Sequence, residues 1–393
     1  MAKARVSADL QAFDQVSLAE LRRRQTEKWR HFPEDVLPAF VAEMDFPLAP
    51  SIREALLDAI ERGETGYAWR STNLAQAFAE FAGRRFDWAV DPANVILIPD
   101  VMVGVTEFLR AAGRPGDGVV INPPVYPPFF SHIAEAGLRV VEAPLTFGQD
   151  GYALDFDSLE HAFVNAGRFY LMSNPHNPTG LVFSRAELQQ IVELAERHEV
   201  IVIADEIHAP LIMPGSRHTP FLALPEAASR GIAFVSASKG WNIPGLKCAQ
   251  AVIASDAMRR LTDRMPEELI ARVGILGIVA SVAAYRSAET WLDTLLQVID
   301  RNRNLLARLI EERLPSVWYR PPNGTYLAWL DCRRLQLPME PVDFFLERGR
   351  VALGPGPRFG KQGAGFVRIT MGTSEAILRE IVERMRQAVE TFR

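Results

Sequence analysis

The sequence predicts an α/β fold in which a mostly parallel sheet lies between helices and a smaller α+β lobe is attached. Two observations carry this prediction. In the middle of the chain, apolar runs of strand length alternate with helical patterns, which is typical of right-handed crossover units in a parallel sheet. After about residue 288 the pattern changes to one long amphipathic helix followed by short strands.

The first crossover unit begins with the apolar run VILIP at residues 95–99. A helical pattern follows over residues 101–112 and stops at the turn GRPGDG, where glycine and proline disfavour regular structure. The run VVI then resumes a strand at residue 119. This order of strand, helix and strand is the repeating unit of the predicted sheet.

The second unit begins with RFYLMSN at residues 168–174 and breaks in the loop PHNPTG. Ser184 and Glu187 then form a capping-box motif, which predicts the start of a helix. The run VIVIAD follows as a strand, and two further strands are predicted in AFVSAS and AQAVIAS. Together these runs supply the core of the sheet.

The C-terminal part of the chain has a different pattern of apolar residues. Apolar residues between 291 and 310 recur at helical spacing, and the short strands TYLAWLD and FVRITMG follow. A last helix is expected to open at Thr373 or Ser374. We therefore predict a small domain made of residues 1–50 and 288–393, and a large domain made of residues 51–287.

Composition narrows the function classes. The 393 residues carry a net charge of −5, which argues against nucleic-acid and anionic-membrane partners. The apolar segment 273–285 is shorter than the roughly 20 residues that span a bilayer, so we expect a buried core helix. Two distant cysteines, and an N-terminus without the apolar core of a signal peptide, favour the cytoplasm.

Three polar segments stand at predicted strand ends: SNPHNPTG, ADEIHAP and SASKGWNIPGLK. In open parallel sheets, ligands bind at the carboxyl ends of strands. Taken singly, Asn177 could be a turn residue, Asp205 a helix cap and Lys239 an exposed lysine. Taken together, a lysine amine and a carboxylate that needs a cation describe a site for pyridoxal phosphate. This cofactor forms a Schiff base with lysine and needs an acidic partner at its pyridine nitrogen.

These segments also carry a family resemblance. NPHNPTG, ADEIHAPL and SASKGWNIPGLK resemble the fold-type I pyridoxal phosphate enzymes of the class I/II aminotransferase superfamily, and within it the MalY/PatB branch of cystathionine beta-lyases. VAEMDFPLAP, TGYAW, PPVYPPF, NGTYLAWLD and FVRITMGTS resemble that branch in the same order. The resemblance implies a large domain with a seven-stranded sheet and a homodimer whose sites are shared between subunits.

The resemblance also implies roles for single residues. Lys239 would be the Schiff-base lysine and catalytic acid/base, and Arg368 would hold the α-carboxylate of an amino-acid substrate. The cofactor ring would be held by Asp205, Asn177, His208 and Tyr126. Its phosphate would be held by Ser236, Ser238 and Lys247, by the backbone amides of Val101 and Met102, and by Tyr67 from the neighbouring subunit. Tyr126 and Asn177 would also contact the substrate.

Three residues depart from the pattern that the resemblance leads us to expect. Asp100 stands where a glycine is common in the first phosphate loop, and Lys247 stands where many aminotransferases carry arginine. Trp241 follows the lysine where the lyases often have phenylalanine. Trp241 could reshape the pocket or fill the same core position.

Three hypotheses for function follow. The first is carbon-sulfur β-lyase activity on L-cystathionine or related cysteine S-conjugates, and the second is aminotransferase activity on the same scaffold. His208 favours the first by resemblance, since aminotransferases generally carry tyrosine at that place. The third is a regulatory protein that binds the cofactor and another protein. No metal motif is present, and His176 and His218 read as loop histidines without metal partners.

Overall fold

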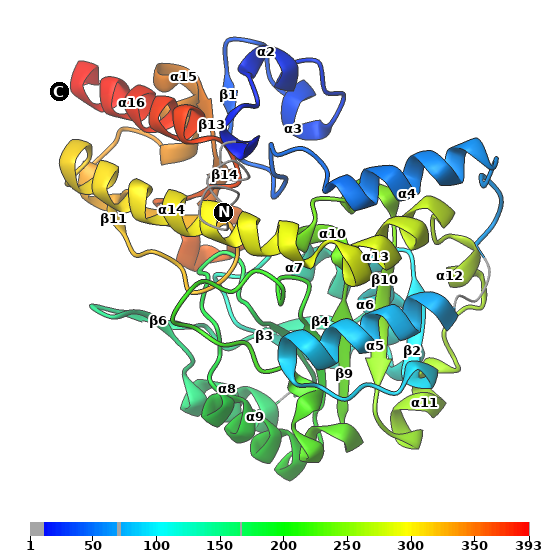
Figure 1. Cartoon of the computed structure of the whole chain (residues 1–393). Helices are drawn as coiled ribbons and strands as arrows, with labels where there is room; N and C mark the ends of the chain where they lie inside the picture. Colours follow the sequence, from blue (N-terminus) through cyan, green and yellow to red (C-terminus); the bar gives the residue numbers. More distant parts are fainter. Residues whose placement is uncertain (1–11, 69–71, 166, 393) are drawn as a thin grey trace.

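The computed structural model describes residues 12–68, 72–165 and 167–392. Its centre is a seven-stranded sheet (Figure 1). All neighbouring strands in it run parallel except at β10, which is antiparallel to both β2 and β9. The predicted mostly parallel sheet is therefore confirmed. From edge to edge the strands are β2 (Val95–Ile98), β10 (Ala249–Ile253), β9 (Gly231–Val235), β8 (Ile201–Asp205), β7 (Gly167–Ser173), β3 (Gly118–Ile121) and β4 (Arg139–Glu142).

Alternate residues of the central strands point into two different cores. In β7, Phe169 and Leu171 belong to one cluster of buried side chains, whereas Tyr170 and Met172 belong to another. Because successive side chains of a strand point to opposite faces, the sheet is covered on both sides. This explains why its strands read as continuous apolar runs.

Helices form both covering layers. One layer supplies buried residues from α6 (Val101–Ala112), α7 (Pro128–Glu135), α11 (Asp256–Thr262) and α12 (Glu268–Ala271). The other supplies them from α5 (Thr72–Phe86), α8 (Phe156–Asn165), α9 (Arg185–Arg197), α13 (Ile275–Ser287) and the first part of α14 (Glu289–Arg313), with α4 (Pro50–Glu61) packed on α13. A hairpin of β5 (Thr146–Gly148) and β6 (Gly151–Ala153) completes this part of the chain.

A separate buried cluster combines the two ends of the chain. Its residues come from positions 21–39 and 305–389. The cluster is built on an antiparallel sheet of β11 (Trp318–Tyr319), β12 (Leu327–Asp331), β15 (Phe366–Thr370) and β14 (Gly354–Pro355), with β1 (Leu37–Pro38) paired to β13 (Val351–Ala352). Around it lie α2 (Leu18–Leu21), α3 (Glu27–Arg30), α15 (Pro341–Gly349) and α16 (Glu375–Phe392). The domain boundaries themselves stay a prediction.

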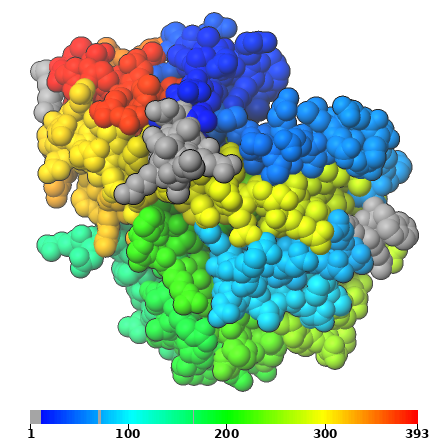
Figure 2. All heavy atoms as spheres, in the orientation of Figure 1, coloured from blue at the N-terminus to red at the C-terminus, as the bar shows by residue number. Residues whose placement is uncertain are grey.

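Figure 2 shows the same arrangement at the surface. The N-terminal segment, in dark blue, lies directly against the C-terminal segment, in red. Residues far apart in the sequence thus form one packed unit, which the long helix α14 joins to the central sheet (Figure 1). The site described below lies where segments of both parts meet.

Local signals read from the sequence agree with these elements. Ser184 and Glu187 form both bonds of the capping box that opens α9. The Oγ atom of Ser374 accepts a hydrogen bond from the N–H of Ile377 at the start of α16. The apolar segment 273–285 largely forms the buried helix α13. Among the described residues, no helix combines the length and apolar character that crossing a membrane would require.

Candidate active site

A cavity of about 280 Å³ opens at the carboxyl ends of the central strands. The segments that follow β7, β8 and β9 meet there, as expected for ligand sites on parallel sheets. Most of the residues singled out in the sequence share its wall. The cavity is lined by Ala42, Asp100, Val101, Met102, Val103, Tyr126, Pro128, His132, Ser173, Asn177, Asp205, Ile207, His208, Ser238, Lys239, Pro244 and Lys247.

Lys239 is carried by the short helix α10 (Ala237–Gly240), which follows β9 directly. Its Nζ atom donates a hydrogen bond of 2.7 Å to the carbonyl oxygen of Ala42. Burial, followed by the positive charge of Arg368, lowers the pKa of Lys239 to about 8. About a tenth of the amine is therefore uncharged at pH 7, far more than for an ordinary lysine, and a nucleophilic lysine must be uncharged.

Asp205 is the last residue of β8 and is 4% exposed. Its Oδ1 atom accepts a 3.1 Å hydrogen bond from the N–H of Ile207. Burial raises the pKa of this carboxyl to about 7, because that bond and the charge of Lys239 offset the loss of water only in part. The carboxyl thus lacks a strong cationic partner in the chain, so a cationic ring nitrogen of a ligand would complete its environment.

His208 follows Asp205 in the same wall and is 3% exposed. Burial lowers the pKa of its ring well below the ordinary value, and the charges of Lys239 and Arg368 act in the same direction. The imidazole is therefore neutral. Its Nδ1 atom is buried without a hydrogen-bond partner, which leaves a polar atom available to a bound molecule.

Arg368 is not part of the cavity lining itself but bonds Asn177, which is. Arg368 lies on β15, and its Nη1 atom donates a 3.1 Å hydrogen bond to Oδ1 of Asn177, while Nη2 donates to the carbonyl of Phe40 at 2.7 Å. Its guanidinium also lies 5.1 Å from the ring centre of Phe359. Burial lowers the pKa of Arg368 to about 10, so the group stays charged, and its Nε atom has no partner. This arrangement suits the binding of a carboxylate.

The opposite end of the cavity offers donors for an anion. Val101 and Met102 begin α6, where N–H groups have no acceptor within the helix and the helix dipole favours negative charge. The Oγ atoms of Ser236 and Ser238 lie 2.7 Å apart, and the Ser236 hydroxyl donates to the carbonyl of Cys248 at 2.8 Å. Val101, Met102 and Ser238 line the cavity and therefore fit a phosphate, whereas Ser236 does not line it and its hydroxyl already donates to the Cys248 carbonyl.

Asp100 has a structural role that the sequence left open. Its Oδ1 atom caps α6 by accepting a 2.9 Å hydrogen bond from the N–H of Val103. Its Oδ2 atom lies 3.3 Å from Nζ of Lys247. The departure from glycine thus supplies a helix cap and a partner that holds Lys247 at the cavity.

Three aromatic residues have different positions. Tyr126 lines the cavity, and burial raises the pKa of its hydroxyl. Trp241 lies in the core, where it packs on Phe81 and Tyr285. Its Nε1 atom donates a 3.0 Å hydrogen bond to the carbonyl of Ala288, so the side chain fills space away from the cavity. Tyr67 is 91% exposed and does not line the cavity.

Some contacts in the site were not predicted from the sequence. The Ala42 carbonyl accepts from both Lys239 and the Tyr326 hydroxyl, at 2.7 and 2.8 Å. Asn242 bonds both backbone groups of Met44 through its side-chain amide. The motifs VAEMDFPLAP, SASKGWNIPGLK and NGTYLAWLD contain these residues, but backbone acceptors leave no signal in a sequence.

The two loop histidines are both buried. His176 lies between the Asn122 carbonyl and Thr179, and His218 packs against Phe86. Among the described residues, no group of three or more His, Cys, Asp or Glu side chains is placed to hold a metal ion. The buried polar atoms of the cavity fit an organic cofactor with a cationic ring nitrogen and a phosphate.

Several known proteins resemble this chain in sequence and structure. Residues 41–385 match the model of the family "Aminotransferase class I and II". A provisionally named cystathionine beta-lyase of Mycobacterium leprae is 45% identical, with 97% of this chain and 98% of that protein covered. Cystathionine beta-lyase of Corynebacterium glutamicum is 34% identical over 94% of this chain and 98% of its own length.

A solved structure gives the same fold. Cystalysin from Treponema denticola, whose crystal structure contains pyridoxal 5'-phosphate, superposes with a TM-score of 0.88 at 29% identity. The match covers 95% of this chain and 98% of cystalysin. The family match, which spans most of the chain, and the 34–45% identity over nearly its full length lead to one conclusion. The chain belongs to the class I and II aminotransferase family.

Proposed function

We propose that this protein is a pyridoxal-phosphate-dependent carbon-sulfur β-lyase. It cleaves L-cystathionine or a related cysteine S-conjugate with one water molecule into a thiol, pyruvate and ammonia. The observation that carries the proposal is the meeting of Lys239 and the incompletely paired carboxyl of Asp205 in one cavity. The names of the relatives support the choice of lyase over other reactions of the family.

Each role follows from the chemistry of a side chain. Lys239 is the attachment point for the cofactor, which when bound acidifies the α-proton of an attached amino acid. Asp205 would pair with the ring nitrogen, and Asn177 and His208 would hold the ring oxygen. Val101, Met102, Ser236, Ser238 and Lys247 would hold the phosphate, and Tyr126 would contact the ring.

Lys239 also moves the proton. Its pKa of about 8 lets the released amine take a proton from the α-carbon and remain poised to return one. Arg368 holds the α-carboxylate of the substrate with two parallel hydrogen bonds, for which its unpaired Nε atom is available. Asn177 orients Arg368 from the side through the 3.1 Å bond.

A homodimer completes the proposal. Tyr67 is 91% exposed in the segment after α4, and we assign it to the phosphate of a neighbouring subunit. Mixing Tyr67→Ala with Lys239→Ala subunits should restore one intact site per mixed dimer, measurable as recovered activity.

A cytoplasmic location is part of the same proposal and is supported by two free cysteines, Cys248 and Cys332.

The reaction is tested with L-cystathionine and no added keto acid. A lyase releases pyruvate, followed with lactate dehydrogenase, and an equal amount of thiol. The family name also covers aminotransferases, and strict dependence on a keto acid would favour that second function. Lys239→Ala serves as the control and should release neither product.

An absorbance spectrum tests the cofactor separately. The purified protein should absorb at about 410–430 nm, as expected when pyridoxal phosphate is bound through a lysine. Lys239→Ala should lose this band. A colourless wild-type protein that takes up no pyridoxal phosphate would contradict the proposed function.

A further inference from the structure

The segment of residues 40–46, called the strap, lies in the chain between β1 and α4, and its residue Ala42 lines the cavity. Its backbone carbonyls bond the two cationic side chains of the site. The Phe40 carbonyl accepts from Arg368 at 2.7 Å, and the Ala42 carbonyl accepts from Lys239 at 2.7 Å. The position of the strap therefore sets where both cations lie.

Asn242 fixes the strap to the segment that carries Lys239. Its Nδ2 atom donates to the Met44 carbonyl at 2.8 Å, and its Oδ1 atom accepts from the Met44 N–H at 2.9 Å. Lys239 and Asn242 are three residues apart, and their partners Ala42 and Met44 are two apart. Two adjacent cross-links thus join the same pair of segments.

The backbone of Asn242 is adapted to this contact. Its φ angle is +56°, in the left-handed region that asparagine tolerates better than most residues. This conformation accompanies the double bond to Met44. A side chain with one acceptor and one donor is needed to satisfy both backbone groups of Met44.

The other side of the strap is held independently. Lys28 and Asp45 form an ion pair of 2.8 Å in which both side chains are almost fully buried. Trp29 donates from Nε1 to the same Asp45 oxygen at 2.9 Å. Breaking a buried pair is costly, so the strap is anchored at Asp45 and directed at Lys239 by Asn242.

The strap also supplies the charge balance around Lys239. Burial and the charges of Arg368 and Lys247 favour the neutral amine, whereas the carboxyls of Glu43, on the strap, and Asp205 favour the ammonium. The Ala42 carbonyl favours the ammonium too, because a charged donor makes the stronger hydrogen bond. Loss of the strap contact would therefore shift Lys239 toward the neutral amine.

We propose that Asn242 is a positioning residue for Lys239, which it places by holding Met44 and thereby the Ala42 carbonyl. That carbonyl receives the Lys239 nitrogen whenever the lysine is free of the cofactor. The inference rests on the proposed function, in which Lys239 both carries the cofactor and moves a proton. It gives the motif VAEMDFPLAP a chemical role at the reacting nitrogen.

The test measures pyridoxal phosphate capture by the full chain after removal of bound cofactor. The capture rate is recorded across pH 6–10 in wild type, Asn242→Gly and Asn242→Ser. Glycine accepts the positive φ angle but removes both bonds, and serine keeps a hydroxyl able to restore one. Gln336→Gly is the matched control, because Gln336 is exposed and has a φ angle of +53°.

In Asn242→Gly, the pH midpoint of capture should fall by about 0.5–1 unit, with a smaller fall in Asn242→Ser. Gln336→Gly should keep the wild-type midpoint. An unchanged or higher midpoint in both Asn242 variants would overturn the inference while leaving the proposed function standing. Should the glycine variant fail to fold, the serine variant decides alone. Absence of capture in wild type would instead contradict the proposed function.

Discussion

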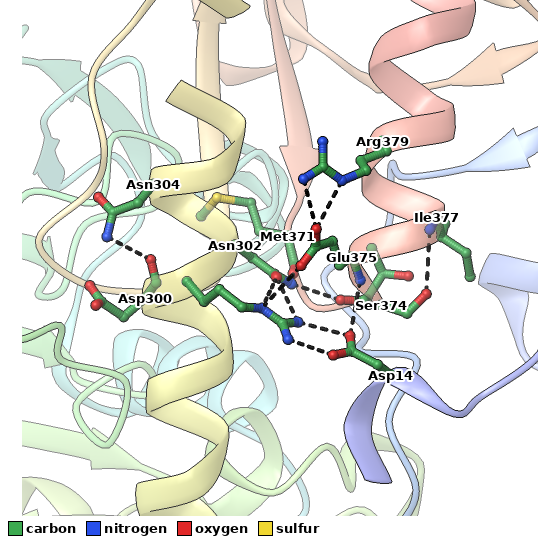
Figure 3. Close-up of polar contacts among 11 residues, drawn as sticks. Asp14, Asp300, Asn302, Asn304, Met371, Ser374, Glu375, Ile377 and Arg379 are labelled. Atoms are coloured by element: carbon green, nitrogen blue, oxygen red, sulfur yellow. Dashed lines mark hydrogen bonds and ion pairs between the residues drawn. The ribbon is translucent and has the colours of Figure 1, made fainter. Parts of the chain in front are cut away.

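Two polar clusters join distant segments of this chain around buried side chains, and they differ in how completely their atoms are paired. The Asn302 cluster, made of Asp14, Arg301, Asn302 and Glu375, links the N-terminal segment to α14 and to the start of α16 (Figure 3). The cavity cluster is made of Asp205, His208, Lys239 and Arg368. Both combine charged side chains with a buried amide or imidazole group.

In the Asn302 cluster, bonds within the chain satisfy the central side chain. Asn302 donates from Nδ2 to the carbonyls of Met371 and Thr373 at 3.0 and 2.7 Å, and its Oδ1 atom accepts from Arg301. Burial alone would raise the pKa of Asp14, but hydrogen bonds from Arg301 and from the N–H of Glu375 lower it overall. Such a cluster stabilises the fold.

In the cavity cluster, polar atoms are left without partners. The Nδ1 atom of His208 and the Nε atom of Arg368 are buried and unbonded, and the pKa of Asp205 is raised to about 7. Asn302 is as buried as the residues of the cavity cluster, although its neighbours Asp14, Arg301 and Glu375 are partly exposed, so burial of a polar side chain alone does not mark a ligand site. Incomplete pairing inside a cavity therefore marks the cluster that binds a ligand.

The largest expected effect comes from Asp205→Asn. The amide cannot pair with a cationic ring nitrogen, so kcat/KM for pyruvate release should fall by about 10²–10³-fold, as for loss of one partner of a buried ion pair. The cofactor-free protein should be at least as stable as wild type at pH 8, because the variant buries no charge there. Activity assays and thermal unfolding measure the two effects. Activity within about threefold of wild type would remove Asp205 from the functional cluster.

Asn302→Ala should show the opposite pattern, in which stability falls and the activity of the folded protein is kept. The carbonyls of Met371 and Thr373 lose their donor, so the free energy of unfolding should fall by about 2–3 kcal/mol. Asn304→Ala is the control, because Asn304 is exposed and makes one bond to the Asp300 carbonyl; it should cost less than about 0.5 kcal/mol. Denaturant unfolding measures both. A large loss of kcat in folded Asn302→Ala would contradict a purely structural role.

The sequence predicted the elements whose signals are local. Apolar runs marked β7 and β8 because both faces of these strands are covered, and the Ser184 capping box marked the start of α9. The edge strand β4 was not predicted, since its residues are exposed or half-buried and have no apolar run. Exposure at the sheet edge removes the periodic signal on which strand prediction depends.

The residues of the site also divide into those that the sequence predicted and those that it could not. Asp205, Asn177 and Lys239 stood in readable motifs at strand ends, and they share one cavity wall. The Ala42 carbonyl could not be foreseen, because any residue supplies a carbonyl and only the fold decides where it points. Trp241 could not be assigned either, since its place in the core depends on packing against α5 and α13.

Glu206 is expected to have the smallest effect on activity and offers the sharpest test of the comparison, because it is buried beside Asp205 yet lines no part of the cavity. Its Oε1 atom accepts a 2.7 Å bond from the N–H of Phe221, and its Oε2 atom has no partner. His218 lies 3.7 Å away, but burial lowers the pKa of that ring to about 3 and leaves it neutral. Burial raises the pKa of Glu206 to about 8, with a further contribution from Asp205.

The raised pKa of Glu206 determines how this carboxyl changes the stability of the fold with pH. Below pH 4.5, the ordinary value for Glu, the carboxyl is neutral in the folded and unfolded chains alike. As pH rises to about 8, the unfolded chain loses this proton first, so Glu206 costs stability progressively across that window. Glu206→Gln removes the titration, and its stability relative to wild type should grow by roughly 2–4 kcal/mol between pH 4.5 and pH 8.

Unfolding of the cofactor-free variant and wild type at several pH values measures this difference. Glu193→Gln, which replaces an exposed side chain on α9, is the control and should show no such growth. Activity of Glu206→Gln should stay within about threefold of wild type, because no ligand meets this carboxyl in the cavity. A stability difference that stays constant with pH would mean that the pKa of Glu206 is the same in the folded and unfolded chains, so that its burial is compensated by its hydrogen-bond partners. Glu206 would then belong with the satisfied structural clusters rather than with Asp205.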